Sequence, residues 1–157
     1  MKKILVSSFL VLLITFNNTA KAAAVSMANN MKTMINNPYK ESKYSQEELY
    51  QDILFSMLTP YIQKAVDDYY RELLTVTPIV DPMSIKILRV DRPNGYRTFY
   101  FIIETQVMPY IGPHNSVGTD NVTISVGGIG EVKILKFKHI EDHPLPPNYL
   151  NIIKKKL

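Results

Sequence analysis

The hydrophobic pattern of this 157-residue chain changes between Thr77 and Pro82, and that change limits the folds available to it. Before it, from Leu49 to Leu73, apolar residues recur at spacings of three and four, which is typical of an amphipathic helix. After it, apolar and polar residues alternate, as on strands with one buried face. A helix followed by strands with mostly short links predicts an α+β domain, in which the helix and one sheet face bury each other.

The helix is predicted to begin at a capping box, Ser45-Gln46-Glu47-Glu48. In this motif the Ser45 hydroxyl accepts from the Glu48 N–H, and the Glu48 carboxylate accepts from the Ser45 N–H. Pro60 interrupts the helical pattern, because proline lacks an N–H and its ring crowds the preceding turn. Either a kinked long helix or two helices divided at Pro60 is expected. The expected apolar stripe is broad and comprises Leu49, Ile53, Leu54, Met57, Leu58, Tyr61, Ile62, Ala65, Val66, Tyr69 and Leu73.

Four strands are expected after the helix, at residues 83–87, 99–107, 122–126 and 132–140. Turn sequences separate the first pair at Asp91-Arg92-Pro93-Asn94-Gly95 and the last pair at Gly127-Gly128-Ile129-Gly130. The apolar phase shifts at Ile134-Leu135, which predicts a β-bulge. A long or Pro-broken helix packed on a four-stranded antiparallel meander resembles the cystatin-like and NTF2-like arrangement, a likeness of fold that assigns no function.

The first 22 residues have the features of a secretory signal peptide. Lys2 and Lys3 precede an apolar run of 13 residues, 4–16, and Ala20-Lys21-Ala22 is a small-x-small cleavage site. The run is shorter than the roughly 20 apolar residues of a membrane-spanning helix. We therefore expect cleavage near Ala22, with Ala24 as the alternative, no stable membrane span afterwards, and a secreted or otherwise extracytoplasmic protein.

Removal of residues 1–22 leaves a linker or weakly ordered arm at 23–44, a single α+β domain at 45–147, and a Lys-rich C-terminal tail at 148–157 that forms either a short helix or a free end. Three lysines leave with the signal peptide, so the mature chain carries 15 basic against 14 acidic residues. This balance gives no electrostatic basis for nucleic-acid binding. The chain contains no Cys, so its core rests on packing rather than on disulfides.

The segment from Pro109 to Asp120 concentrates side chains that can bind or react. Tyr110, His114, Asn115 and Asp120 offer a phenol, an imidazole, an amide and a carboxylate between two expected strands. Loops held on a rigid scaffold often carry functional groups, so these four are candidate binding residues. The structural alternative is a long connection in which Asp120 stabilises a turn by bonding to the backbone.

No motif in the sequence names a reaction. There is no Cys nucleophile, no Gly-x-Ser-x-Gly elbow and no phosphate-binding glycine loop. Zinc-type ligands occur at His139, Glu141, Asp142 and His143, with His114 and Asp120 before them, but their spacing is not diagnostic. We therefore expect no catalytic residues, no metal and no cofactor. The adjacent Tyr69 and Tyr70 are expected at the edge of the core with hydrated hydroxyls.

Several segments carry a resemblance to a known family. They are Glu47-Glu48-Leu49 and Leu58-Thr59-Pro60-Tyr61-Ile62 on the helix, Gly112-Pro113-His114 through Val117-Gly118-x-Asp120, and Lys133 to His139 ahead of Leu145-Pro146. Together they resemble the bacterial domain of unknown function 3888 family, short exported proteins of Gram-positive spore formers. The resemblance implies export and one small domain, and it supplies no catalytic residues.

Two functions of different classes are compatible with these residues. The favoured one is a non-catalytic binding or interaction module outside the membrane, with an unknown extracellular or cell-wall partner and an apolar patch beside the Gly112 to Asp120 segment. The alternative is a small hydrolase or other enzyme, with His114 as general base and Asp120 or Glu104 orienting it. The second requires a carboxylate within hydrogen-bond reach of His114.

Overall fold

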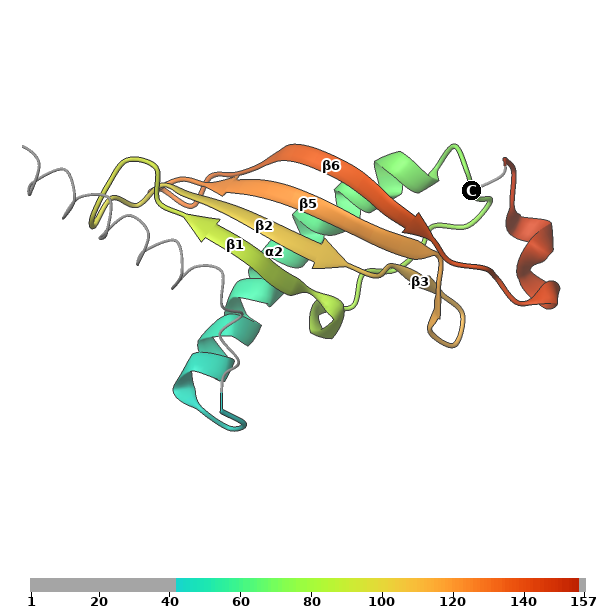
Figure 1. Ribbon diagram of the computed structural model, residues 1–157, viewed down its shortest axis with the longest axis horizontal. Coiled ribbons are helices and arrows are strands. Elements are labelled where there is room, and N and C mark those ends of the chain that lie inside the picture. Colours follow the sequence, from blue (N-terminus) through green and yellow to red (C-terminus); the bar gives the residue numbers. More distant parts are fainter. Residues whose placement is uncertain (1–41, 156–157) are drawn as a thin grey trace, which may run out of the picture. The chain divides into compact units, whose positions relative to one another are not determined.

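The computed structural model describes residues 42–155, so the expected signal peptide and nearly all of the expected linker lie outside the described residues. Within this range one long helix accompanies a four-stranded antiparallel sheet, which confirms the predicted α+β architecture (Figure 1). None of the helices described in this range is long and apolar enough to cross a membrane.

Helix α2, Gln46–Tyr70, begins at the predicted cap. The Glu48 N–H donates to Ser45 Oγ over 3.1 Å, which satisfies one of the free N–H groups of the first turn. The Glu48 carboxylate accepts from the Tyr44 N–H rather than from the Ser45 N–H. The Ser45 N–H instead donates to the Ser42 carbonyl over 3.1 Å. The second bond of the capping box is therefore displaced by one residue.

Pro60 lies inside α2 and does not divide it, so the alternative of two helices is excluded. Proline leaves the Ser56 carbonyl without its usual N–H donor. Beside it, the Thr59 hydroxyl donates to the Phe55 carbonyl over 2.7 Å, a type of bond that often accompanies helix bending. The proline itself is exposed, so its ring does not disturb the packed face of the helix.

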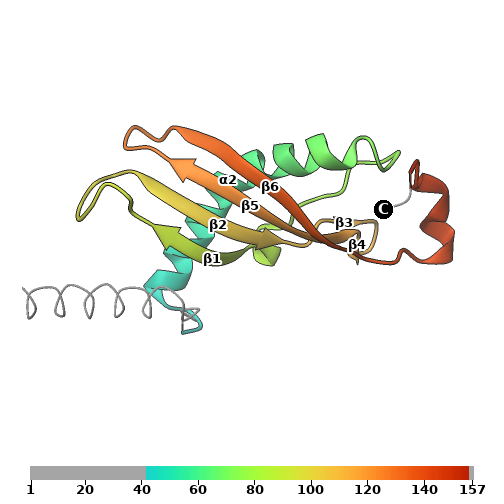
Figure 2. The same cartoon turned by 45° about the horizontal axis from the view of Figure 1, so that its top comes forward.

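The sheet consists of β1 (Lys86–Asp91), β2 (Phe101–Val107), β5 (Gly118–Val126) and β6 (Val132–Asp142), in that spatial order. Figure 2 shows the two edges, β1 and β6, with α2 behind the sheet. A short ribbon of β3 (Tyr110–Ile111) and β4 (Asn115–Ser116) is inserted between β2 and β5. The first strand starts later than predicted because Pro82–Ser84 form a 3-10 helix, η1, in which Asp81 accepts from the Met83 N–H over 2.9 Å.

Two β-bulges lie on β6. Thr123 pairs with Lys136 and Ile124 with Ile134, so Leu135 is the extra residue, as the sequence predicted. A second shift was not predicted: Thr119 pairs with Glu141 and Asp120 with His139, which leaves Ile140 extra. An extra residue reverses which face the following side chains occupy. The second bulge therefore sets the orientation of everything on β6 after His139.

The buried face of α2 is narrower than the predicted stripe. Five residues form it and pack against the inner face of the sheet: Phe55, Leu58, Ile62, Val66 and Tyr70. Four residues of the predicted stripe are instead 41–66% exposed: Leu49, Ile53, Met57 and Tyr61. At 100° per residue these four residues run along the side of the helix opposite the buried five, so the predicted stripe combined two different sides of α2.

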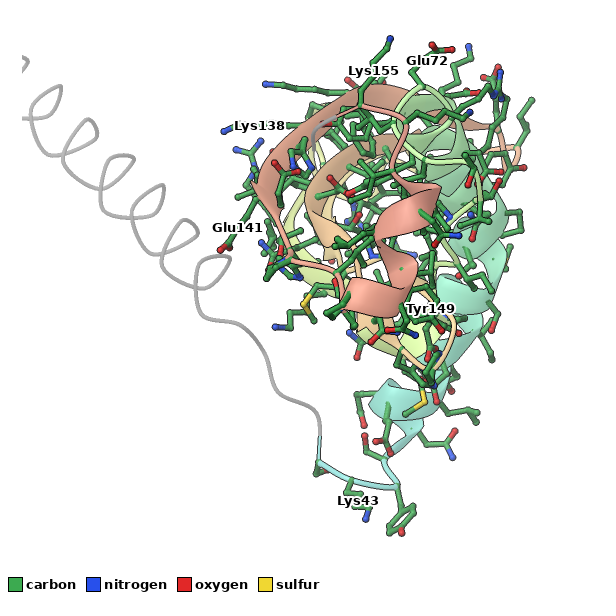
Figure 3. All side chains as sticks on the ribbon, turned by 90° about the vertical axis from the view of Figure 1, so that its right-hand side faces the viewer. Lys43, Glu72, Lys138, Glu141, Tyr149 and Lys155 are labelled. Carbon is green, nitrogen blue, oxygen red and sulfur yellow. The ribbon has the colours of Figure 1, made fainter. Side chains whose placement is uncertain are left out.

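The end of the chain packs onto the domain. Residues Pro147–Ile152 form the 3-10 helix η2, and Ile153 makes an antiparallel bridge with Leu74. The Lys154 N–H donates to the Leu73 carbonyl over 2.8 Å. Figure 3 shows Lys155 beside Glu72, with 3.9 Å between Nζ and Oε2, and Tyr149 on η2. Of the two alternatives for this segment, the structure shows a short helix.

Candidate functional site

Asp120 is the only candidate binding residue of the four that is completely buried among the described residues. It lies on β5, on the face covered by α2, and two side chains from other elements bond to its carboxylate. The Tyr70 hydroxyl donates to Oδ2 over 3.0 Å, and His139 Nδ1 lies 2.7 Å from Oδ1. Asp120 therefore joins the end of α2 to β5 and β6, and does not stabilise a turn.

His139 lies between two carboxylates. Its Nε2 is 2.8 Å from Asp142 Oδ1, while its Nδ1 faces Asp120. Residues three apart on a regular strand face opposite sides, so the extra residue Ile140 is what brings Asp142 to the side of His139. A neutral imidazole has one N–H and one lone pair and cannot donate to both carboxylates. A neutral ring therefore donates to only one of the two carboxylates at a time.

Aromatic rings cover this cluster. The Tyr69 ring stacks on His139 with 5.2 Å between centroids and 21° between planes, and it lies 4.9 Å from the Phe137 ring. The Tyr70 ring meets His139 edge-on at 6.2 Å. These rings leave the His139 side chain only 19% exposed. Low exposure strengthens its charge-assisted hydrogen bond to Asp120.

Gly118 makes room for the cluster. A Cβ at this position would lie 2.6 Å from the Tyr70 hydroxyl oxygen, 2.7 Å from the Glu141 carbonyl oxygen and 2.8 Å from His139 Cε1. These distances are shorter than any real Cβ contact, and the Glu141 oxygen belongs to the backbone and cannot move aside. Glycine is required here for close approach rather than for its backbone angles.

Burial is the largest cause of the pKa shifts of Asp120 and Tyr70. Burial raises the pKa of the Asp120 carboxyl above its usual value, while the bonds from His139 and Tyr70 oppose that shift. Burial and the neighbouring Asp120 charge raise the pKa of the Tyr70 hydroxyl, so it stays protonated and donates to Asp120. The structure therefore corrects the expectation for Tyr70, whose hydroxyl is not hydrated.

The other three candidate residues lie on the β3–β4 ribbon and, in the part of the structure described, make no hydrogen bond to Asp120. Tyr110 pairs with Ser116, and its ring stacks on the exposed His114 at 4.5 Å and 28°. Asn115 pairs with Ile111 and is half-buried. His114 has a φ of 61°, in the left-handed region. Across residues 42–155, neither a hydrogen bond nor an ion pair joins the His114 ring to a carboxylate.

The remaining acidic and imidazole candidates have other partners. Glu104 lies 3.9 Å from Arg89 in a partly exposed ion pair. His143 Nδ1 lies 2.9 Å from Ser116 Oγ, and His143 Nε2 lies 3.0 Å from Thr119 Oγ1. These hydrogen bonds link β4 and β5 to the residue that follows β6. In the described part of the chain, no group of three or more His, Cys, Asp or Glu residues has the geometry to hold a metal ion.

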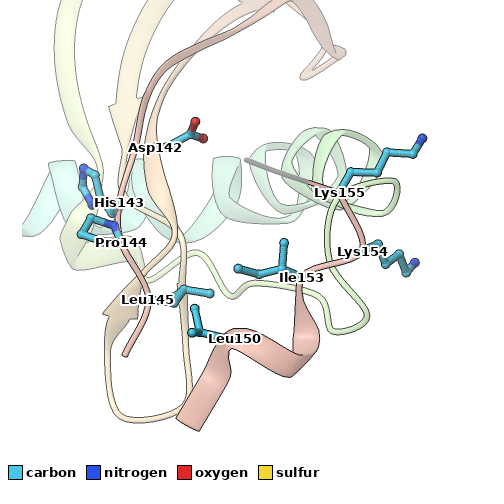
Figure 4. A pocket seen from close by; sticks show the side chains of 8 residues that line it. All are labelled: Asp142, His143, Pro144, Leu145, Leu150, Ile153, Lys154 and Lys155. Carbon is cyan, nitrogen blue, oxygen red and sulfur yellow. The ribbon is translucent and has the colours of Figure 1, made fainter. Parts of the chain in front are cut away.

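An open pocket lies next to the site, where the end of β6 meets η2 (Figure 4). Its volume is about 690 Å³, and its apolar wall is formed by Pro144, Leu145, Leu150 and Ile153. Asp142 and His143 line one end, and Lys154 and Lys155 line the other. Because His143 bonds to Ser116 and Thr119, this pocket adjoins the segment that the sequence singled out.

A protein-family model described as a protein of unknown function, DUF3888, matches residues 50–141. The match covers more than half of the chain. The chain belongs to the DUF3888 family. The DUF3888 region contains Tyr70, Gly118, Asp120 and His139, and it ends one residue before Asp142. No curated protein and no solved structure matches the chain.

Sequence reasoning identified Asp120 but paired it with His114 or left it in a loop. The residues that contact it, Tyr70 and His139, are 50 and 19 positions away in the chain. His139 and Asp120 were grouped only as zinc-type ligands, and Tyr70 only as an aromatic. Gly118 within the DUF3888 region was the available signal, because a glycine inside a strand often marks close approach of another group.

Proposed function

We propose that this protein is a non-catalytic binding module that works outside the membrane. The observation that carries the proposal is the open pocket of about 690 Å³ between the end of β6 and η2. Its wall is apolar, and its position beside Ser116 and Thr119 is where the sequence led us to expect a patch. Ligand pockets are typically concave and mostly apolar, with a few polar groups at the rim.

The charges at the rim favour a ligand with an apolar group and a negative charge. The Asp142 carboxylate faces His139 Nε2 at 2.8 Å, at the opposite end of the pocket from the lysines. Lys154 donates to the Arg71 carbonyl over 2.8 Å and keeps its positive charge without a carboxylate partner in the described range. An extracellular peptide or wall component with an apolar side chain next to a carboxylate has this chemistry.

The test uses 8-anilinonaphthalene-1-sulfonate, an apolar dye with one negative charge, titrated into the full-length protein. Leu150 on the pocket wall is 53% exposed and Leu135 on β6 is 50% exposed, so they form a matched pair. Leu150→Asp is expected to weaken saturable dye binding at least tenfold, and Leu135→Asp to leave it unchanged. Equal titrations for both variants would remove the pocket as the binding site.

The extracytoplasmic part of the proposal rests on the sequence of residues 1–22. Mass spectrometry and N-terminal sequencing of the protein from the culture medium of an expressing Gram-positive host are expected to give a chain that begins at Ala23, or at Val25 if Ala24 is used. Replacement of Ala20 and Ala22 by Lys should abolish that cleavage. Retention of an unprocessed chain inside wild-type cells would contradict export.

The alternative of an enzyme based on His114 receives no support from these contacts. A general base needs a partner that orients it, and Asp120 and Glu104 are engaged by other residues. His139 has such a partner in Asp120, but its second nitrogen faces Asp142. Neither imidazole combines an orienting carboxylate with a free nitrogen.

A further inference from the structure

A second hollow lies between α2 and the edge strand β6. Its volume is about 560 Å³. Tyr61, Ala65 and Tyr69 line it from the helix, and Val132, Ile134 and Phe137 line it from the strand. The polar members of its lining, Lys64 and Asp68, bond to each other over 2.7 Å and so neutralise each other. The hollow is therefore an apolar groove along one side of a strand, and all its lining residues belong to the family-matched region.

The strand beside this groove has one partner. Within residues 42–155, β6 pairs only with β5, so its outer edge has no strand beside it. A sheet edge presents backbone N–H and C=O groups that can pair with another extended chain. Between the bulges at Leu135 and Ile140, the four residues 136–139 keep regular pairing with β5. This stretch includes Phe137, which lines the groove.

The opposite face of the same stretch carries uncompensated positive charge. Lys136 and Lys138 are exposed, and their neighbours on β5 are the neutral Thr123 and Asn121. Figure 3 shows Lys138 projecting on the side away from α2. Lys133 differs, because it has an ion pair with Glu131 at 2.9 Å. Of these three lysines, only Lys136 and Lys138 make no ion pair in the described range.

We propose that the β6 edge binds an extended peptide segment of a partner protein by strand addition, with acidic and apolar residues alternating along the peptide. Side chains on a strand alternate between faces, so residues opposite Lys136 and Lys138 face the lysines while the residue between them faces Phe137 and the groove. The minimal pattern is acidic–apolar–acidic. The site is separate from the pocket beside η2.

Lysines and bulges on an edge strand also protect proteins from edge-to-edge aggregation. That role explains the positive charge, but it does not call for an apolar groove beside the same residues. The groove supplies the pockets for alternate side chains that specify peptide recognition by strand addition, while backbone bonds supply affinity. The two features occur together at Lys136, Phe137 and Lys138.

The test uses fluorescently labelled, capped peptides with the full-length protein and anisotropy as the readout. A peptide with Glu-Val-Glu-Val-Glu at its centre is expected to bind at least ten times more tightly than one with Lys-Val-Lys-Val-Lys. N-methylation of alternate backbone amides on the pairing edge of the acidic peptide should lower affinity at least tenfold. Equal binding of the methylated peptide would overturn strand addition, because charge attraction alone is insensitive to it.

Two charge-reversal variants locate the site. The double variant Lys136→Glu, Lys138→Glu should lower the affinity for the acidic peptide at least tenfold. The double variant Lys86→Glu, Arg97→Glu makes the same charge change away from β6 and should have little effect. Tyr61→Ala should weaken binding through the groove wall, and Leu150→Asp should not change it. Equal effects of the two charge reversals would overturn the proposal. Sedimentation that shows self-association through β6 would assign the edge to a second copy and also overturn it.

Discussion

Two histidines of this protein lie against tyrosine rings, and their surroundings differ in every other respect. His139 stacks on Tyr69, has a carboxylate at each ring nitrogen, and is 19% exposed. His114 stacks on Tyr110 at the exposed tip of the β3–β4 ribbon, with a positive φ. Ring stacking alone therefore does not mark a structural centre. Buried, charge-assisted bonds do, because their partners cannot return to water.

The largest effect is expected from Asp120→Ala. The substitution leaves the buried Tyr70 hydroxyl and the His139 ring without their acceptor, and loss of one member of a buried polar cluster costs about 3 kcal/mol of unfolding free energy. Urea unfolding followed by circular dichroism measures it. Asp142→Ala is the control, because that carboxylate is 44% exposed and its bond is expected to contribute less than about 1 kcal/mol. Similar losses for both variants would show that burial of Asp120 is not decisive.

A smaller effect is expected from Gly118→Ala, which tests whether the cluster depends on close approach. The added methyl group meets the Tyr70 hydroxyl and the Glu141 backbone oxygen, and overpacking of this kind costs about 2 kcal/mol. Gly127→Ala is the matched control, since its Cβ would meet atoms only at 3.7 Å, an ordinary contact. The control should change the unfolding free energy by less than about 0.5 kcal/mol. A loss at Gly127 as large as at Gly118 would contradict the steric explanation.

The pH dependence of stability distinguishes the charge of Asp120 from its hydrogen bonds. Its pKa is raised in the folded protein, so the folded state keeps the proton that the unfolded state releases as pH rises above about 4. The contribution of Asp120 to the unfolding free energy of the wild-type protein therefore falls as pH rises from the pKa of Asp120 in the unfolded chain to its higher pKa in the folded protein. Asp120→Asn lacks that loss, so its stability relative to wild type should improve with pH across this window.

Urea midpoints of both proteins between pH 3.5 and 7 measure this difference. Carboxyl groups away from the cluster titrate in both proteins, so their contributions largely cancel in the comparison. If the urea midpoints of wild type and Asp120→Asn change in parallel with pH, then burial does not raise the pKa of Asp120 in the folded protein.

The sequence predicted those features that depend on local patterns. The helix start at Ser45, the glycine turn before β6 and the bulge at Leu135 each follow from residues within a few positions of one another. Contacts of His139 could not be predicted in this way. They depend on the β5–β6 register and on a second bulge at Ile140, and neither changes the apolar pattern enough to be recognised.

The prediction for α2 failed for a local reason. Leu49 and Leu58 are nine residues apart, about half a turn around the helix, so Leu58 faces the sheet and is buried while Leu49 faces away and is half exposed. Spacings of four rotate the apolar pattern gradually, and along 25 residues this joins residues from two sides of the helix into one apparent stripe. The candidate residue Asp120 was found because it ends a segment rich in reactive side chains that was expected to connect two strands, whereas its partners come from parts of the chain that only the fold brings together.

The smallest effect is expected at His114, and it is measured by making the same substitution at both histidines. His139→Asn shortens the side chain and removes one of the two carboxylate contacts, which should cost about 2 kcal/mol. His114→Asn should change the unfolding free energy by no more than about 0.5 kcal/mol, because asparagine tolerates a positive φ and the exposed ring has no hydrogen bond to lose among the described residues. If His114→Asn instead costs as much as His139→Asn, then the stack on Tyr110 stabilises the fold, and the ribbon is part of the structural core rather than a surface that is free to contact a ligand.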